Sequence, residues 1–425
     1  MAHQNLATLA SMVDAKRGAQ TVAPGTVKNL LFLSHCVPTP PDKGEKIRAY
    51  HEIRQLASRY SIHLACFGRS AAEVDEAQQL AGCCASVYAE EIGRAALMGA
   101  AGRFAFGWSV NEAFYHSRKM KRYVERLATQ VQMDAAVAFS VVMAPYAPPQ
   151  TPMLLDMIDV DSEKWLDYAR SRRPAALFNL EARRLRQLEI RWSRAARLVA
   201  FTTGSEERLF QSFAPGVATC HVENGIDSTF FDGAAHRLPP DLSGRQFVVF
   251  VGTMDYHPNI QAARWFAEAV LPELRRQSRE IEFYIVGRNP PAALLKLNGN
   301  GGVRVTGGVP DIRPYLASAR AIVVPLRLAR GIQNKVLEAL AMGREVFATP
   351  EVVRTFGSVP PTGVVCCDSA QAFVDRLLVR CSAQPECDPN IRAEACRRFS
   401  WNRAGALFAE HLEKLVSAVP AGSSA

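Results

Sequence analysis

Short apolar runs alternate with amphipathic segments along most of this chain, and this alternation restricts the fold more than any other feature. An apolar run at 27–38, an amphipathic segment at 44–60 and a second apolar run at 61–68 predict a strand, a helix and a strand. Strands that alternate with helices form parallel sheets, because each connection must cross back over the sheet. The sequence therefore predicts an α/β protein with helices on both faces of a parallel sheet.

The alternation continues along the first half and starts again after a loop at 236–246. In the first half we expect further strands at 134–140, 152–159 and 197–203, and a long helix at 177–196. In the second half we expect strands at 247–254, 282–287, 321–326 and 345–350, and helices at 259–277, 312–319, 330–343 and 372–383. Two parallel-sheet domains follow, with a ligand site in the cleft at the carboxyl ends of their strands.

Length and composition agree with two domains. A chain of 425 residues exceeds one ordinary core, and 48% hydrophobic with 21% charged residues is typical of globular proteins. The best membrane-span candidate is interrupted by Arg94 and Arg103, so it lacks the roughly 18 to 20 continuous apolar residues of a span. The ten cysteines form no CxxC pair, which indicates a reduced, cytosolic chain.

The predicted boundaries follow from these patterns. Residues 1–26 carry charges without a continuous apolar stretch, which predicts a flexible extension rather than a signal peptide. We assign 27–240 to the first domain and 241–400 to the second. The remainder, 401–425, is expected to form a helix that packs back toward the first domain and then a disordered tail.

The net charge of +9 is concentrated in one segment. Between Arg170 and Arg197 stand nine arginines, against only Glu181 and Glu189. Such a strip is suited to contact an anionic membrane surface, a pyrophosphate-linked acceptor or nucleic acid. The alternative is a solvated helix face with internal ion pairs.

The stretch 330–343, RGIQNKVLEALAMG, carries the strongest chemical signal. Gly331 follows an apolar run and permits close approach of backbone to a ligand, and the following helix presents its N–H groups and positive dipole end. Asn334, Lys335 and Glu338 share one flank of that helix, and the opposite flank is aliphatic. Lys335 is suited to neutralise phosphate, and Glu338 to accept hydrogen bonds from vicinal hydroxyls. The alternative is a surface helix with an incidental lysine–glutamate pair.

This layout resembles the nucleotide-sugar site of family GT4 glycosyltransferases, which have the GT-B fold of two Rossmann-like domains. The family's helix carries a glutamate, seven residues and a second glutamate; Glu338 falls on the second, which in that family binds ribose, and Arg330 stands where the first is expected. With FVGTMDYHPNIQAARWF, DMIDVDSEKW, VENGID and PPDKGEKIRAYHEIRQLA, residues 28 to 415 resemble a narrower branch. This branch contains the sugar transferases associated with the exosortase, PEP-CTERM and exopolysaccharide systems of Gram-negative bacteria.

The resemblance implies a site made by both domains, the first binding the acceptor and the second the nucleotide sugar. It places Lys43 and Gly44 near the donor phosphates, a role that a cation and a glycine fit physically. Many GT4 members have a phosphate-binding arginine and lysine after the first strand of the second domain, where this chain has Gly252, His257 and Asn259. We expect these three residues, with Arg288, Arg330 and Asn334, to help bind the diphosphate. Asn224-Gly225 of VENGID is taken as a mainly structural turn.

Asp159 and Asp161 form a DxD pattern, which in other glycosyltransferases binds a metal and a nucleotide diphosphate. Here the pattern ends a strand of the first half, so we assign it to the acceptor side, where a carboxylate orients or deprotonates a hydroxyl. No metal is assigned to it. The alternative is that Asp161 and Ser162 cap the next helix. His35, after the first strand, faces the cleft or is a buried, satisfied histidine.

The sequence thus predicts a glycosyltransferase of hexosyltransferase type that moves a sugar from a nucleoside-diphosphate sugar to a hydroxyl acceptor in exopolysaccharide or cell-envelope glycan synthesis. The resemblance implies retention at the anomeric carbon without an obligatory cofactor. We expect a lipid-linked or glycan acceptor, no nucleic-acid partner, and a cytoplasmic protein, peripheral on the inner face of the plasma membrane if the arginine strip binds lipid. The alternatives are a nucleotide-sugar 2-epimerase of the same fold and a non-catalytic scaffold that binds nucleotide or membrane.

Overall fold

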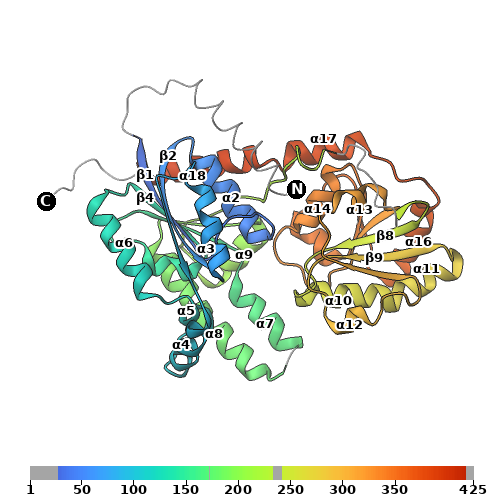
Figure 1. The fold of residues 1–425 in the computed structure, drawn as a ribbon, viewed down its shortest axis with the longest axis horizontal. Helices are drawn as coiled ribbons and strands as arrows, with labels where there is room; N and C mark the ends of the chain where they lie inside the picture. The colour runs from blue at the N-terminus through green and yellow to red at the C-terminus, as the bar shows by residue number, and fades with distance from the viewer. Residues whose placement is uncertain (1–26, 172, 233–241, 418–425) are drawn as a thin grey trace.

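The computed structural model describes residues 27–171, 173–232 and 242–417, which form two domains, each built on one parallel sheet (Figure 1). The predicted flexible extension at 1–26, most of the loop at 236–246 and the end of the predicted tail lie outside the described residues. Within the described part, no helix is long and apolar enough to cross a membrane. The predicted α/β class, with two Rossmann-like parallel-sheet domains, is confirmed.

The first domain contains a seven-stranded sheet of order β3-β2-β1-β4-β5-β6-β7, with every adjacent pair parallel. Its strands are β1 (Lys28–Ser34), β2 (Tyr60–Gly68), β3 (Ser86–Glu91), β4 (Ala135–Phe139), β5 (Met153–Ile158), β6 (Leu198–Phe201) and β7 (Thr219–His221). The five central strands were predicted, because they are nearly continuous apolar runs. The edge strands β3 and β7 were not.

Helices cover both faces of this sheet. They are α2 (Gly44–Leu56), α3 (Ala71–Glu76), α4 (Arg94–Ala105), α5 (Val110–Phe114), α6 (Arg118–Gln130), α7 (Asp161–Ser171), α8 (Ala175–Ala195) and α9 (Gly204–Phe213). The predicted helices at 44–60 and 177–196 correspond to α2 and α8. Helices α4, α5, α7 and α8 form the lower part of the first domain in Figure 1.

The second domain repeats the design with six parallel strands in the order β10-β9-β8-β11-β12-β13. The strands are β8 (Gln246–Val251), β9 (Ile281–Val286), β10 (Val303–Gly307), β11 (Ala321–Val324), β12 (Val346–Ala348) and β13 (Val364–Cys366). The helices of this half are α10 (His257–Trp265), α11 (Leu271–Gln277), α12 (Ala292–Leu295), α13 (Arg313–Ser318), α14 (Asn334–Ala341), α15 (Pro350–Val353), α16 (Ala370–Cys381) and α17 (Pro389–Arg398). All four strands predicted for this half are present.

The strand order reverses between β1 and β4 in the first sheet and between β8 and β11 in the second. At such a switch point the neighbouring connections leave toward opposite faces of the sheet, which opens a crevice at the carboxyl ends of the strands. Loops from both crevices line one cavity between the domains. The loop that follows β11 is one of them, and it leads into α14. The fold therefore places the predicted 330–343 motif at the cleft.

The last helix, α18 (Trp401–Ser417), returns to the first domain and lies along α2 (Figure 1). Its side chains Phe408, Ala409 and Leu412 are buried in the same core as Leu30 and Phe32 of β1. The chain thus crosses between the domains twice, once near residue 224 and once before α18.

Gly225 permits the contact between these two crossings. A Cβ atom at this position would lie 2.5 Å from the backbone nitrogen of Trp401. We expect Gly225→Ala to lower the thermal midpoint by several degrees, since about 1–3 kcal/mol is typical of overpacking a well-packed contact. Differential scanning calorimetry measures this, with Gly82→Ala as the control, because a Cβ there would meet nothing within 4 Å. Equal midpoints for the two variants would show that Trp401 can move without cost.

Candidate active site

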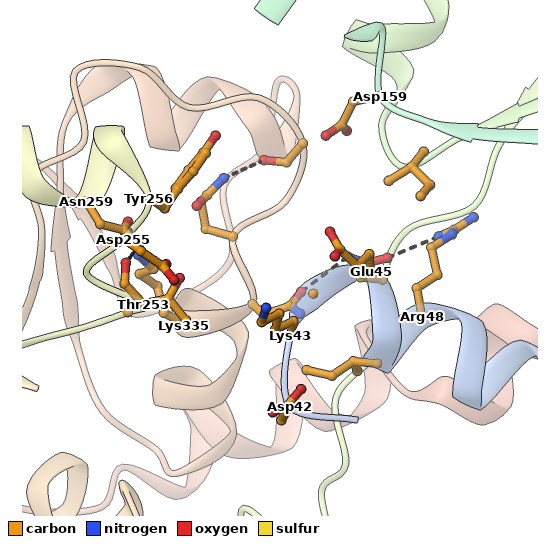
Figure 2. Close-up of a pocket in the computed structure, with 18 of the residues that line it drawn as sticks. Asp42, Lys43, Glu45, Arg48, Asp159, Thr253, Asp255, Tyr256, Asn259 and Lys335 are labelled. Atoms are coloured by element: carbon orange, nitrogen blue, oxygen red, sulfur yellow. Dashed lines mark hydrogen bonds between the residues drawn. The ribbon is translucent and has the colours of Figure 1, made fainter. Parts of the chain in front are cut away.

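A cavity of about 1180 Å³ lies between the two domains. Figure 2 shows Lys43 and Glu45 of the first domain across from Thr253, Tyr256 and Lys335 of the second. The predicted site residues that line it are Lys43, Gly44, Asp159, Asp161, Gly252, Asn259, Arg288, Arg330, Gly331, Asn334, Lys335 and Glu338. His257 is not among the described residues that line the cavity, although Tyr256 and Asn259 are, so its place in the donor site stays a prediction. Successive residues of a helix point about 100° apart, so the first turn of α10 presents only some of its side chains.

Two glycines bring backbone close to functional groups. Gly331 has a φ of 64°, and a Cβ on it would lie 2.5 Å from Oδ1 of Asp159 in the other domain. A Cβ on Gly252 would lie 2.7 Å from Nδ2 of Asn259 and 2.9 Å from Nζ of Lys335. Gly331 therefore allows the α14 loop to reach the first domain, and Gly252 leaves room for the amide and the ammonium group.

Lys335 is held at the cavity by the second domain. Its Nζ donates to Oδ1 of Asn259 at 2.8 Å and lies 4.5 Å from the centre of the Phe250 ring. Burial lowers the pKa of Lys335 to about 7, although Glu338 acts in the opposite direction. The side chain of Gln333 does not cap α14, because it donates to the carbonyls of Arg330 and Gly331. The start of α14 thus combines an ammonium group with a helix N-terminus that lacks a side-chain cap.

Glu338 lies one turn further along α14 and also faces the cavity. Burial raises its pKa to about 7, with Lys335 acting in the opposite direction. Nζ of Lys335 donates its hydrogen bond to Asn259, and Lys335 and Glu338 both line the cavity. On the other flank of α14, Val336, Leu337 and Leu340 are fully buried.

The first domain contributes an acidic wall. Oδ1 of Asp159 accepts a hydrogen bond from Thr202 at 2.8 Å. Lys164, which sequence reasoning missed, lies with its Nζ 3.1 Å from Asp159 and 2.9 Å from Asp161. Burial alone would lower the pKa of Lys164, but the carboxylates of Asp161 and Asp159 raise it well above its ordinary value. Asp159 and Asp161 therefore share one ammonium group at the cavity.

Arg330 contacts the first domain. Its guanidinium is bound by three carboxylates of the first domain: Asp167 at 2.7 Å, Glu206 at 3.5 Å and Glu163 at 3.6 Å. These carboxylates balance its charge, and the ion pairs join the two domains. Arg330 also lines the cavity, and its role in donor binding stays a prediction.

Other polar contacts also join the domains. Arg288, expected to supply a cation to the diphosphate, is paired with Asp42 at 2.8 Å. Nδ2 of Asn224 donates to Oδ1 of Asn334 at 3.2 Å, and Oδ1 of Asn224 accepts from the buried Arg48 at 3.1 Å. The VENGID turn therefore links α2 to α14, in addition to its place beside Trp401. A Cβ on Gly44 would lie 3.7 Å from Asn334, so α2 begins close to α14.

The arginine strip is partly used inside the first domain. Arg184 donates to the carbonyls of Phe104 and Trp108. Arg186 is paired with Glu163, and Arg191 with Glu112. The strip is therefore not a uniform free cationic face, because part of it contacts other residues of the first domain.

Sequence reasoning missed or undervalued two further residues of the cavity. Arg69 directly follows β2 and lies over the rings of Phe114 and Tyr115. His35 directly follows β1, stacks on Phe139, and places Nδ1 3.3 Å from the carbonyl of that residue. Position at the carboxyl end of a central strand was the available signal for both.

Two Rossmann-like domains with a cavity between them define the GT-B class of folds. Residues 245–380 match the family model described as Glycosyl transferases group 1. No curated protein sequence matches the chain. The second domain is thus the part of this chain that resembles a known family at the level of sequence.

Solved structures match over nearly the whole chain. Sucrose-phosphate synthase from Thermosynechococcus elongatus has a TM-score of 0.64 at 15% identity, covering 92% of this chain and 100% of its own. Anabaena HepE in complex with UDP and glucose has a TM-score of 0.62 at 13% identity, with coverage of 91% and 100%. The UDP-forming trehalose-phosphate synthase from Burkholderia vietnamiensis has a TM-score of 0.61 at 11% identity, with coverage of 91% and 100%. The fold is that of GT-B glycosyltransferases, and the family match supports a glycosyltransferase.

Proposed function

We propose that this protein transfers a sugar from a nucleoside-diphosphate sugar to a hydroxyl group of an acceptor. One observation carries the proposal: Gly331 in the loop before α14, and Lys335 and Glu338 on α14, line a single cavity with Asp159 and Asp161 of the first domain. A diphosphate group fits an uncapped helix N-terminus beside an ammonium group, and a ribose diol fits a carboxylate one turn further on.

In the proposed reaction the acceptor oxygen forms a bond to the anomeric carbon, and the bond from that carbon to the diphosphate oxygen breaks. The leaving diphosphate takes the electron pair of that bond, and Lys335 with the first turn of α14 stabilises its charge. The hydroxyl proton passes to Asp159 or Asp161, or to the departing phosphate oxygen. Lys164 holds both carboxylates in place.

Several finer statements belong to the same proposal. Uracil is the first base to test, because the HepE structures contain UDP or UDP-glucose. The resemblance to GT4 enzymes supports retention, with no obligatory cofactor, and a place in exopolysaccharide or cell-envelope glycan synthesis. The proposed acceptor is lipid-linked or a glycan. The proposed location is the cytoplasm, with the protein peripheral on the inner face of the plasma membrane.

The test combines binding with product analysis. Thermal shifts with UDP, GDP, ADP, CMP and their common sugar conjugates identify the base, and mass spectrometry with candidate acceptors detects the glycosylated product. Specific stabilisation by one nucleoside diphosphate and mass gain of an acceptor are expected. If the protein isomerises the nucleotide sugar in the absence of an acceptor, the epimerase hypothesis is favoured. If it binds nucleotide without any turnover, the scaffold hypothesis is favoured.

We expect the protein to take up a proton from solvent when it binds the donor above pH 7, and to release one when it binds the donor below pH 7. Burial lowers the pKa of Lys335 and raises that of Glu338, each to about 7. A diphosphate favours the ammonium form and a ribose diol the carboxylate form, so binding takes up a proton at pH 8 and releases one at pH 6. Calorimetric titration of UDP-glucose in buffers of different ionisation enthalpy measures both. Above pH 8 the affinity should fall by up to about tenfold per pH unit.

Lys335→Met is the matched variant for this experiment. It should lose the proton uptake at pH 8 and retain the release at pH 6, because Glu338 remains. An affinity that stays constant from pH 6 to 9, without proton exchange, would show that neither group contacts the donor.

A further inference from the structure

We propose that the acceptor is an amphiphile, a phosphate joined to an apolar chain, whose phosphate binds Arg69 and whose chain lies along α4. This proposal rests on the proposed transferase function and names the class of its acceptor. It is argued from the wall of the cavity that the first domain forms opposite α14.

From Ala96 onward, where the structure describes its side chains, α4 turns uncharged residues to solvent. The exposed positions in this described part are Leu97, Met98, Ala101, Gly102, Ala105 and the capping residue Phe106. They repeat at the spacing of one helix face, and Met98 and Phe106 are 81% and 87% exposed. A surface helix normally exposes its charged face and buries its apolar one, so an exposed apolar face indicates a contact with an apolar ligand or partner.

This face is continuous with the cavity. Leu97 of α4 lines the cavity and is also exposed to solvent. Val110, at the start of α5, likewise lines the cavity and is exposed. Phe114 and Tyr115 continue the apolar lining inward from Val110. Figure 1 shows α4 beside α5 and α8 in the lower part of the first domain. An apolar strip thus leads from the cavity to the outer surface of α4.

Arg69 is an exposed residue that lines the cavity beside Phe114 and Tyr115. Its Nη2 donates to the hydroxyl of Tyr115 at 2.6 Å, and its Cζ lies 4.8 Å from the centre of the Phe114 ring. These aromatic groups orient the guanidinium without neutralising it, and no carboxylate of the described residues forms an ion pair with it. Arginine in this state is suited to bind a phosphate through two parallel hydrogen bonds.

The other arginines of the cavity lack this property. Arg48 is paired with Asp156, Arg288 with Asp42, and Arg330 with Asp167. Arg69 is therefore the lining arginine whose charge is left for a ligand among the described residues. Because Arg69 lines the cavity and is not part of α4, a ligand bound to it places its anionic group in the cavity. This placement favours an acceptor over general adsorption of the protein to a bilayer.

Dodecyl phosphate, used below its micelle concentration, is the probe. By calorimetric titration it should bind at least about tenfold more tightly than ethyl phosphate, which lacks the chain, or dodecyl glucoside, which lacks the charge. The double variant Leu97→Gln, Met98→Gln should weaken dodecyl phosphate binding by about tenfold or more. Arg69→Gln should do the same and leave dodecyl glucoside binding unchanged. Val379→Gln, a change at an apolar position of α16 that is 76% exposed, is the control and should bind as the wild type.

Three results would overturn the proposal: equal binding of ethyl and dodecyl phosphate, equal affinities in all folded variants, or binding of phosphatidylcholine vesicles through α4 without binding of dodecyl phosphate. Arg69→Lys and Phe106→Gln replace any variant that does not fold, as judged by circular dichroism. UDP thermal shifts in the same samples separate the two proposals. Loss of dodecyl phosphate binding with intact UDP binding rejects only the amphiphilic acceptor, and absent UDP binding rejects the transferase.

Discussion

Glu338→Ala is expected to lower kcat/KM for the nucleotide sugar by about 100-fold or more without unfolding the protein. Two hydrogen bonds from a ribose diol to a carboxylate are worth about 1.5–3 kcal/mol each, and alanine removes both. Burial raises the pKa of Glu338 to about 7, so its ionised form destabilises the folded state, and this cost is fully present above pH 7. Alanine should therefore raise the thermal midpoint more at pH 8 than at pH 5. Nucleoside-diphosphate release and calorimetry measure the two effects.

Glu351→Ala provides the control for this variant. Glu351 lies on α15 of the same domain, outside the cavity, in a surface pair with Arg354. It should keep wild-type turnover and show no gain in midpoint at pH 8. Full turnover in folded Glu338→Ala would show that Glu338 does not bind the donor. The similarity of α14 to the GT4 helix would then reflect structure and not donor binding.

The central strands of both sheets could be predicted because burial on two faces makes them nearly continuous apolar runs. Strands β1, β4 and β5 of the first sheet, and β8 and β11 of the second, are such runs. The missed strands all lie at sheet edges: β3, β7, β10 and β13. An edge strand packs on one neighbour only, and β3 and β13 contain no fully buried residue, so their sequences lack the apolar signal.

The site could be predicted where one helix carries it and not where two domains meet. Asn334, Lys335 and Glu338 share a flank of α14, which helical periodicity alone fixes. The partners of Arg330 lie on α7 and α9, elements of the other domain, and only the packing of the domains brings them together. Lys164 was missed for a related reason, because its two carboxylates become neighbours only when α7 forms after β5.

Arg330→Glu, which would restore the glutamate expected at the first position of the family pattern, should inactivate rather than improve the protein. Glutamate would lose the pairs with Asp167, Glu163 and Glu206 and add a fourth carboxylate to three that are largely buried. Removing one partner of a buried ion pair costs about 3–5 kcal/mol, and like charges add to this. We expect the domains to separate, seen as a larger radius of gyration by small-angle scattering, and kcat/KM to fall about 100-fold or more.

Charge reversal itself is controlled by Arg264→Glu, which breaks a surface pair with Glu268 on the same domain and should change neither property. The double variant Arg330→Glu, Asp167→Arg restores opposite charges across the gap and should recover part of the activity and the compact form. If Arg330→Glu alone stays compact and active, the guanidinium does not hold the domains together. Recovery in the double variant would show that residue 330, at the position of the first family glutamate, holds the acidic wall of the first domain against α14.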